Sequence, residues 1–117
     1  MKNIKKIAII GADPSGVSSY LQLIKELHNN LISITIFDTL GIAKSFSFNT
    51  DLASSLNNTS IGVSSLYADD KLDYFKWLQD KKPNLNVSSS DFVSRYYFKE
   101  YCHDRFWQSK KYADSFG

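Results

Sequence analysis

Residues 4–16 of the chain have the sequence IKKIAIIGADPSG, a short apolar run that leads into two glycines five positions apart. The run Ile4–Ile10 is nearly all β-branched or apolar, which is typical of a strand covered on both faces of a parallel sheet. Gly11 breaks this strand, and Pro14 and Ser15 suit the first turn of a helix. The stretch therefore predicts a strand, a tight turn and a helix.

The following residues continue the same pattern. Between positions 15 and 27 the apolar residues recur every three or four positions, which gives a helix one apolar stripe: Val17, Tyr20, Leu21, Ile24 and Leu27. Two asparagines at 29–30 end the helix, and Ile32–Phe37 (ISITIF) is a second β-branched run that closes with Asp38. Strand, helix and strand with short joints predict a right-handed parallel crossover, so residues 1–40 are expected to form a βαβ core of an α/β fold.

The rest of the chain has a different composition. Residues 41–67 are rich in Ser, Asn and Thr, and we expect long loops there with one or two short strands. Residues 68–111 are predicted to be mainly helical, and Asp69 or Asp70 can cap the first of these helices. Its apolar face would be formed by Leu72, Phe75, Trp77 and Leu78.

A final helix is expected from a cap at Ser90 or Asp91 to about Lys111. Its face would use Val93, Tyr97, Phe98, Tyr101, Cys102 and Phe106. The aromatic residues of this segment can pack a core, contact a partner, or form a stacking platform for a flavin or a base, and packing or partner contact is favoured. Cys102 next to His103 is interpreted as a packing cysteine, because no cluster of metal ligands surrounds it in the sequence.

Length and charge exclude several classes of protein. The 117 residues suffice for one domain at most, and the net charge of +2 favours neither nucleic acid nor an anionic membrane. The apolar run before Gly11 is shorter than the roughly 7–15 residues of a signal-peptide core, and no stretch approaches the ~20 apolar residues of a membrane span. The single cysteine excludes an internal disulfide. We expect a cytoplasmic protein.

The turn from Gly11 to Gly16 lies where a phosphate-binding loop would lie, between a strand and a helix. The first glycine permits the tight turn, and the last lets the helix pack close to the strand. Free N–H groups and the helix dipole can then meet the charge of a pyrophosphate, and the Ser15 hydroxyl can donate as well. Such a turn alone can also be an ordinary strand–helix connection, but the second strand and its terminal Asp38 favour a dinucleotide site.

Two aspartates qualify this interpretation. Asp38, about 20 residues after the turn, can accept hydrogen bonds from the ribose hydroxyls of an adenosine. Asp13 stands where a dinucleotide loop commonly has glycine, and its carboxylate would repel a pyrophosphate. Three outcomes are open: the Asp13 side chain turns outward, a cation or Lys44 offsets its charge, or the site no longer binds tightly.

The stretches IAIIGADPSG and ISITIFD resemble the N-terminus of FAD/NAD(P)-binding flavoproteins with a Rossmann-type fold, whose loop is commonly G-x-G-P-S-G. Shorter motifs extend the resemblance loosely to about Phe106, to a group related to the flavin-dependent N-hydroxylating monooxygenases. These motifs are LNNT at 56–59, DYFKWL at 73–78, FVSR at 92–95 and EY at 100–101. Only the first forty residues are specific.

The resemblance implies a set of cofactor contacts. The pyrophosphate of FAD would be lined by Gly11, Asp13, Pro14, Ser15 and Gly16, and its ribose by Asp38. The segment from Lys44 to Thr59 would pass near the flavin, with Asn57 or Asn58 as a polar contact. Arg95 would lie by the FAD or by the helix that supports it, although an exposed arginine at the start of a helix is an equal alternative. In such proteins NAD(P)H reduces the flavin, so no side chain here has to be catalytic.

Members of the resembled family run to several hundred residues, and two strands cannot complete a parallel sheet. Residues 1–117 are therefore expected to form a single, incomplete or truncated domain, a fragment or a subunit that a second polypeptide completes. The first functional hypothesis is the FAD-binding N-terminal part of a flavin-dependent oxidoreductase, such as an NAD(P)H-dependent monooxygenase. The alternatives are a degenerate, non-catalytic nucleotide-fold module that binds protein partners, and a module that binds an adenine nucleotide without redox chemistry.

Overall fold

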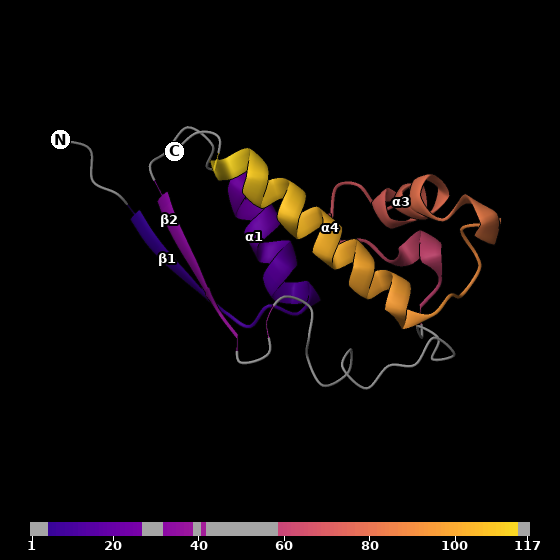
Figure 1. Ribbon diagram of the computed structural model, residues 1–117, viewed down its shortest axis with the longest axis horizontal. Helices are drawn as coiled ribbons and strands as arrows, with labels where there is room; N and C mark the ends of the chain where they lie inside the picture. Colours follow the sequence, from indigo (N-terminus) through magenta and orange to yellow (C-terminus); the bar gives the residue numbers. More distant parts are fainter. Residues whose placement is uncertain (1–4, 27–31, 39–40, 42–58, 115–117) are drawn as a thin grey trace.

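The computed structural model describes residues 5–26, 32–38, 41 and 59–114 (Figure 1). The elements in chain order are β1 (Lys5–Ile10), α1 (Pro14–Glu26), β2 (Ile32–Phe37), the 3₁₀ turn η1 (Ile61–Val63), α3 (Asp73–Lys81), the 3₁₀ turn η2 (Pro83–Leu85) and α4 (Arg95–Asp114). The βαβ unit thus comes first in the chain, and the helices α3 and α4 come later.

The two strands form a parallel sheet. Lys5 lies opposite Ile32 at one end of the pair, and Ile10 lies opposite Phe37 at the other. Helix α1 connects the strands in sequence and packs against β1. This confirms the predicted strand–helix–strand order, and the fold is a partial Rossmann-like α/β unit followed by helices.

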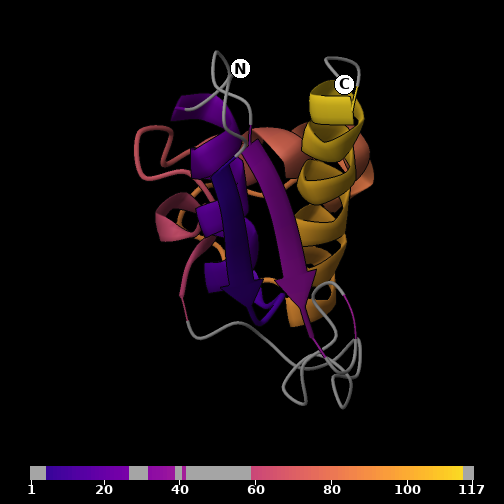
Figure 2. The ribbon, with the colours of Figure 1, turned by 90° about the vertical axis from the view of Figure 1, so that its left-hand side faces the viewer.

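The two faces of this sheet differ strongly. Ile9, Ile34 and Ile36 point to the inner face and pack against the core. On the outer face Ile10 is 80% exposed and Phe37 is 54% exposed. Figure 2 shows the strands in front, with α1 and α4 both on the far side of the sheet. The expectation that both faces are covered is wrong for the described residues, because these helices lie on one side only.

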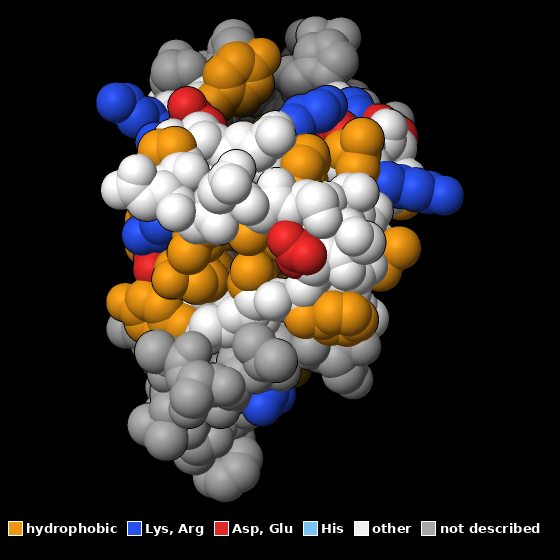
Figure 3. Space-filling view, turned by 90° about the vertical axis from the view of Figure 1, so that its right-hand side faces the viewer, with side chains coloured by type: hydrophobic (Ala, Val, Ile, Leu, Met, Phe, Trp, Pro, Cys, Tyr) orange, Lys and Arg blue, Asp and Glu red, His pale blue; other side chains and the backbone are white. Residues whose placement is uncertain are grey.

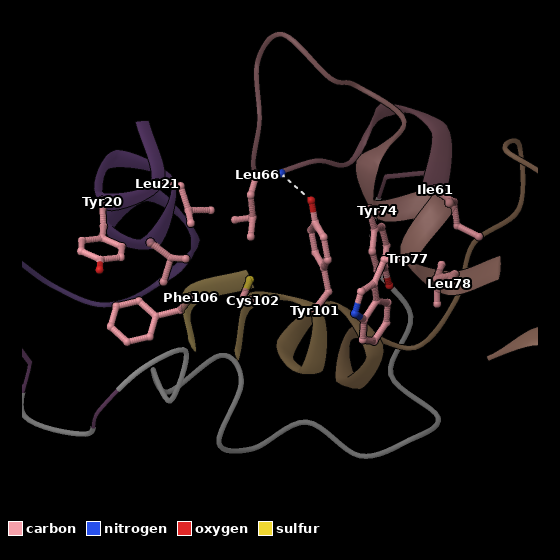
Figure 4. Close-up of a cluster of buried hydrophobic side chains, with 11 residues drawn as sticks. Tyr20, Leu21, Ile61, Leu66, Tyr74, Trp77, Leu78, Tyr101, Cys102 and Phe106 are labelled. Carbon is pink, nitrogen blue, oxygen red and sulfur yellow. Dashed lines mark hydrogen bonds between the residues drawn. The ribbon is translucent and has the colours of Figure 1, made fainter. Parts of the chain in front are cut away.

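The core lies between α1, α3, α4 and the segment before α3 (Figure 4). The apolar stripe of α1 enters it through Val17, Tyr20 and Leu21, which are all buried, as the sequence predicted. The other fully enclosed residues come from the second half of the chain: Ile61, Leu66, Tyr74, Trp77, Leu78, Tyr101, Cys102 and Phe106. The predicted face of the final helix is therefore confirmed as a packing face, with Tyr101 and Phe106 inside it.

The predicted helix starts need correction. Helix α3 begins at Asp73 after Leu72, and no side chain caps it. Asp69 contacts Lys25 of α1 and Asp70 contacts Lys76, so both aspartates are used as partners of lysines.

Helix α4 also begins later than predicted, at Arg95. The Asp91 carboxylate accepts a hydrogen bond from the Ser88 N–H at 2.8 Å and closes a turn before the helix. Ser94 takes the capping position instead, because its hydroxyl accepts a hydrogen bond from the Tyr96 N–H at 3.2 Å. The turn at 88–91 therefore determines which of the neighbouring serines and aspartates caps α4.

No helix in the described part of the chain has the length and apolar character needed to cross a bilayer. On the face that lies to the right in Figure 1, apolar side chains occur in separate groups between polar ones (Figure 3). Exposed single apolar residues of this kind are common on protein surfaces.

Candidate functional site

The turn between β1 and α1 has the backbone geometry that its first glycine predicts. Gly11 has a φ of +97°, in the left-handed region where a side chain would be strained. Its N–H donates to the carbonyl of Phe37 at 2.7 Å, which ties the turn to the end of β2. The turn therefore lies at the carboxyl ends of both parallel strands, which is where open α/β sheets bind ligands.

Gly16 brings the start of α1 against this turn. A Cβ atom at Gly16 would lie 2.0 Å from the carbonyl oxygen of Gly11 and 3.6 Å from the Cγ2 of Ile9. The first distance is far shorter than any contact that two such atoms tolerate, so only a glycine allows this packing. The two glycines thus perform the conformational roles expected of a phosphate-binding turn.

Asp38 lies at the same edge and holds the two strand ends together. Its Oδ2 accepts a hydrogen bond from the Ala12 N–H at 2.8 Å, and its Oδ1 accepts one from the Gly41 N–H at 3.0 Å. A carboxylate has about four acceptor positions, which is the chemistry that a ribose hydroxyl donor requires. The sequence correctly placed Asp38 beside the turn, and its contact with a ribose stays a prediction.

The N-terminus of α1 presents donors that the helix itself does not use. The first bond of helical type runs from the Val17 N–H to the Asp13 carbonyl at 2.9 Å. The N–H groups of Asp13, Ser15 and Gly16 precede it and have no acceptor within the helix, and Pro14 has no N–H. Three backbone donors and the positive end of the helix dipole therefore converge at the turn, which is an arrangement that binds an anion.

Asp13 is the residue of the turn whose side chain does not fit this arrangement. Its Oδ1 atom is buried and has no hydrogen-bond partner among the described residues. Burial raises the pKa of the Cys102 thiol to about 12, and the charge of Asp13 adds to this increase. Which of the three expected outcomes holds for the Asp13 side chain stays a prediction.

The remaining residues that are predicted to contact the cofactor are Arg95, Lys44, Asn57 and Asn58. Arg95 is the first residue of α4 and is partly buried. Lys44, Asn57 and Asn58 lie outside the described residues. Their roles beside a flavin remain predictions.

A second feature, which the sequence analysis did not predict, is an open groove of about 980 Å³ between α1, α3 and α4. Arg105 lies along it and binds Asp73 with two hydrogen bonds, of 2.9 Å from Nε and 3.2 Å from Nη2. The Tyr101 hydroxyl donates to the same carboxylate at 2.7 Å. Asp73 lies about thirty positions from Tyr101 and Arg105 in the sequence, so no local pattern could predict this network. Within the network the carboxylate of Asp73 and the guanidinium of Arg105 neutralise each other's charge.

A family model described as FAD-NAD(P)-binding matches residues 8–115 of the chain. The matched range starts inside β1 and includes the glycine turn, Asp38 and all the later helices. No curated protein and no solved structure matches the chain significantly.

Proposed function

The chain belongs to the FAD-NAD(P)-binding family, and from this premise we propose that its glycine turn binds the pyrophosphate of a dinucleotide, with FAD as the first candidate. The observation that carries the proposal is the close packing of Gly16 on the Gly11 carbonyl. That packing places the start of α1 at the strand ends, and the N–H groups of Asp13, Ser15 and Gly16 are left there for an anion.

In this proposal each residue of the turn has a binding task. The three N–H groups and the Ser15 hydroxyl donate to phosphate oxygens, and Asp38 accepts from ribose hydroxyls. Arg95 is assigned to the cofactor or to the helix that supports it. A bound FAD would supply redox chemistry, and the chain would bind and orient it. The resemblance to N-hydroxylating flavoproteins supports a role as the FAD-binding part of an NAD(P)H-dependent monooxygenase.

We further propose that a second polypeptide covers the outer face of the sheet. Strands of parallel sheets are normally covered on both faces, whereas Ile10 and Phe37 are exposed here. A two-stranded sheet is also marginal without further strands. A candidate polypeptide should slow hydrogen exchange of the β1 and β2 amides when mixed with this chain, and unchanged exchange would count against it.

The test of cofactor binding is a calorimetric titration of the full chain with FAD, NADH and NADPH. FAD is expected to bind, and Ser15→Ala should weaken it by about tenfold, because a hydrogen bond to a charged phosphate is lost. Ser19→Ala is the matched control, since Ser19 lies one turn further along α1, is exposed, and its hydroxyl bonds only the Ser15 carbonyl among the described contacts.

The outcomes separate the hypotheses. Loss of binding in the Ser15 variant with no change in the Ser19 variant supports the turn as the site. Equal affinities in all three proteins would place the cofactor elsewhere. Failure of every dinucleotide to bind would favour the non-catalytic module that acts through protein partners.

A further inference from the structure

The groove between α1, α3 and α4 has the size and the mixed chemistry of a site for a small organic molecule. Its volume is about 980 Å³, at the upper end of the roughly 300–1,000 Å³ that such sites have. Helix α1 contributes the apolar side chains of Leu21 and Ile24, and the aromatic rings of Tyr67 and Tyr112 also line the groove. These side chains offer apolar and aromatic contacts to a planar apolar body.

The groove is separate from the glycine turn. The residues that α1 contributes to it belong to the second half of the helix, and Ile24 lies about 15 Å along the helix axis from Pro14, where α1 begins. A phosphate at the turn and a ligand in the groove would thus lie at different ends of α1.

Arg105 supplies the groove with hydrogen-bond donors that are held in place. Its Nε and Nη2 atoms each donate to the carboxylate of Asp73, and Nη1 donates to the Oε1 of Gln108 at 2.8 Å. A guanidinium has five N–H groups, so two of them, one on each terminal nitrogen, have no acceptor among the residues that the structure describes. The side chains of Arg105 and Asp73 are only 21% and 14% exposed, and their two-fold hydrogen-bonded pair holds the guanidinium in one orientation.

The hydrogen bonds of the lining favour an acceptor in the ligand over a donor. The Asp73 carboxylate already accepts from two nitrogens of Arg105 and from the Tyr101 hydroxyl. The other two aspartates of the lining, Asp69 and Asp70, lie at more exposed positions and are each paired with a lysine. A carboxylate in the groove would therefore find donors at its most enclosed polar group, whereas an ammonium group would face a guanidinium there.

Lys25 adds a second positive group to the lining. Its ion pair with Asp69 joins side chains that are 50% and 56% exposed, and exposed pairs of this kind contribute little to stability. Exchange of the Asp69 carboxylate for that of a ligand therefore costs little free energy. We propose that the groove binds a small aromatic carboxylate, whose carboxylate contacts Arg105 and Lys25 and whose ring packs on the apolar side chains of α1.

The experiment is an amide-resolved NMR titration of the full chain with phenylacetate, phenylethanol and phenethylamine. The three compounds share a benzene ring and the same number of carbon atoms, and they differ in charge. Phenylacetate is expected to cause saturable shift changes at the amides of Tyr67 and Arg105. It should bind at least about tenfold more tightly than the other two compounds, because only a carboxylate gains charge-assisted hydrogen bonds from the guanidinium.

Two variants and a matched control locate the carboxylate. Arg105→Gln should weaken phenylacetate binding by about tenfold or more, and Lys25→Gln by about threefold. Lys110→Gln is the control, because Lys110 is also a partly exposed lysine paired with an aspartate, but it does not line the groove. This control should bind as the wild type does. Circular dichroism melts verify that each protein is folded, and the Lys25 variant decides the outcome where the Arg105 variant does not fold.

Equal affinities for phenylacetate and phenylethanol would overturn the proposal, because the groove would then recognise only the ring. Tighter binding of phenethylamine would overturn it in favour of a cationic ligand. Unchanged phenylacetate affinity in the folded variants, shift changes confined to residues 11–16, or no saturable change at all would also overturn it. None of these results bears on the dinucleotide site at the glycine turn, which is tested separately with FAD.

Discussion

The sheet and the helical half of this molecule are stabilised to very different degrees. Leu78, Tyr101 and Cys102 of the helical half are completely enclosed, and the rings of Tyr74 and Trp77 pack against Tyr101. The sheet has one covered face, and Ile10 on its other face is mostly exposed. The candidate ligand site lies on the first turn of α1, between these two regions. The comparison indicates that the helical half forms most of the closed core and that the sheet forms the edge at which we propose that a ligand binds.

The largest expected effect is the difference in stability between two alanine substitutions, one of a core residue and one of a residue on the exposed face of the sheet. Leu78→Ala should lower the free energy of unfolding by about 2–5 kcal/mol, because it leaves a cavity in a closed core. Ile10→Ala removes a side chain of the same size from the exposed face and should change it by less than about 0.5 kcal/mol. Urea unfolding of both variants measures the difference. Equal losses of free energy of unfolding would contradict the contrast between the closed core and the exposed face of the sheet.

A second effect is confined to alkaline pH and to the helical half. Burial raises the pKa of Cys102 from about 9 to about 12, so the unfolded thiol ionises at a pH where the folded thiol remains neutral. Burial also raises the pKa values of Tyr74 and Tyr101. Stability is therefore fully present below about pH 9. It should fall by about 1.4 kcal/mol per pH unit from there, and more steeply above about pH 10, where the two tyrosines also ionise in the unfolded chain.

Urea unfolding at pH 8, 9, 10 and 11 measures this loss. Cys102→Ala should flatten the curve between pH 9 and 10, even though it lowers the overall stability by leaving a small cavity. A stability that stays constant from pH 8 to pH 11 would contradict the enclosure of this region.

A third prediction concerns the edge of the sheet. Asp38→Ala removes the acceptor of the Ala12 and Gly41 N–H groups and the proposed ribose contact. We expect FAD binding to weaken by about 1–3 kcal/mol, measured by calorimetry. Unchanged affinity would mean that Asp38 does not contact the ribose and only links the ends of the two strands.

The smallest effects come from two tyrosines that lie side by side in the core, with ring centroids 4.9 Å apart. The Tyr101 hydroxyl accepts from the Leu66 N–H (Figure 4) and donates to Asp73. The buried Tyr74 hydroxyl, in contrast, has no hydrogen-bond partner among the described residues. Tyr101→Phe should cost about 1–2 kcal/mol of stability, and Tyr74→Phe should be neutral or slightly stabilising. Thermal melts compare the two, and equal losses would contradict the assigned hydrogen bonds.

The elements that periodicity could predict are those whose partners lie nearby in the sequence. The β-branched runs and the stripe of α1 specify the parallel unit, and the apolar face of the final helix specifies Tyr101 and Phe106 as core residues. The starts of α3 and α4 could not be predicted in this way. Asp69 contacts a lysine of α1, and Asp91 closes a turn, so distant or competing partners decided which residue caps a helix.

In the candidate site, too, some features follow from local sequence patterns and others depend on tertiary packing. The positions of Gly11, Gly16 and Asp38 follow from backbone geometry that a local pattern encodes, and the structure brings these residues together. The enclosure of the Asp13 Oδ1 atom is a result of tertiary packing, which no local pattern contains. The exposure of the outer sheet face is likewise a property of how the helices are placed.

The central claim is that the turn at the start of α1 binds a dinucleotide, and an amide-resolved NMR titration of the full chain with FAD tests it most directly. The account predicts that the largest chemical-shift changes fall on the amides of Asp13, Ser15 and Gly16, with smaller changes at Asp38 and almost none in α3. Saturable changes confined to the groove beside Arg105, or no changes at all, would contradict it.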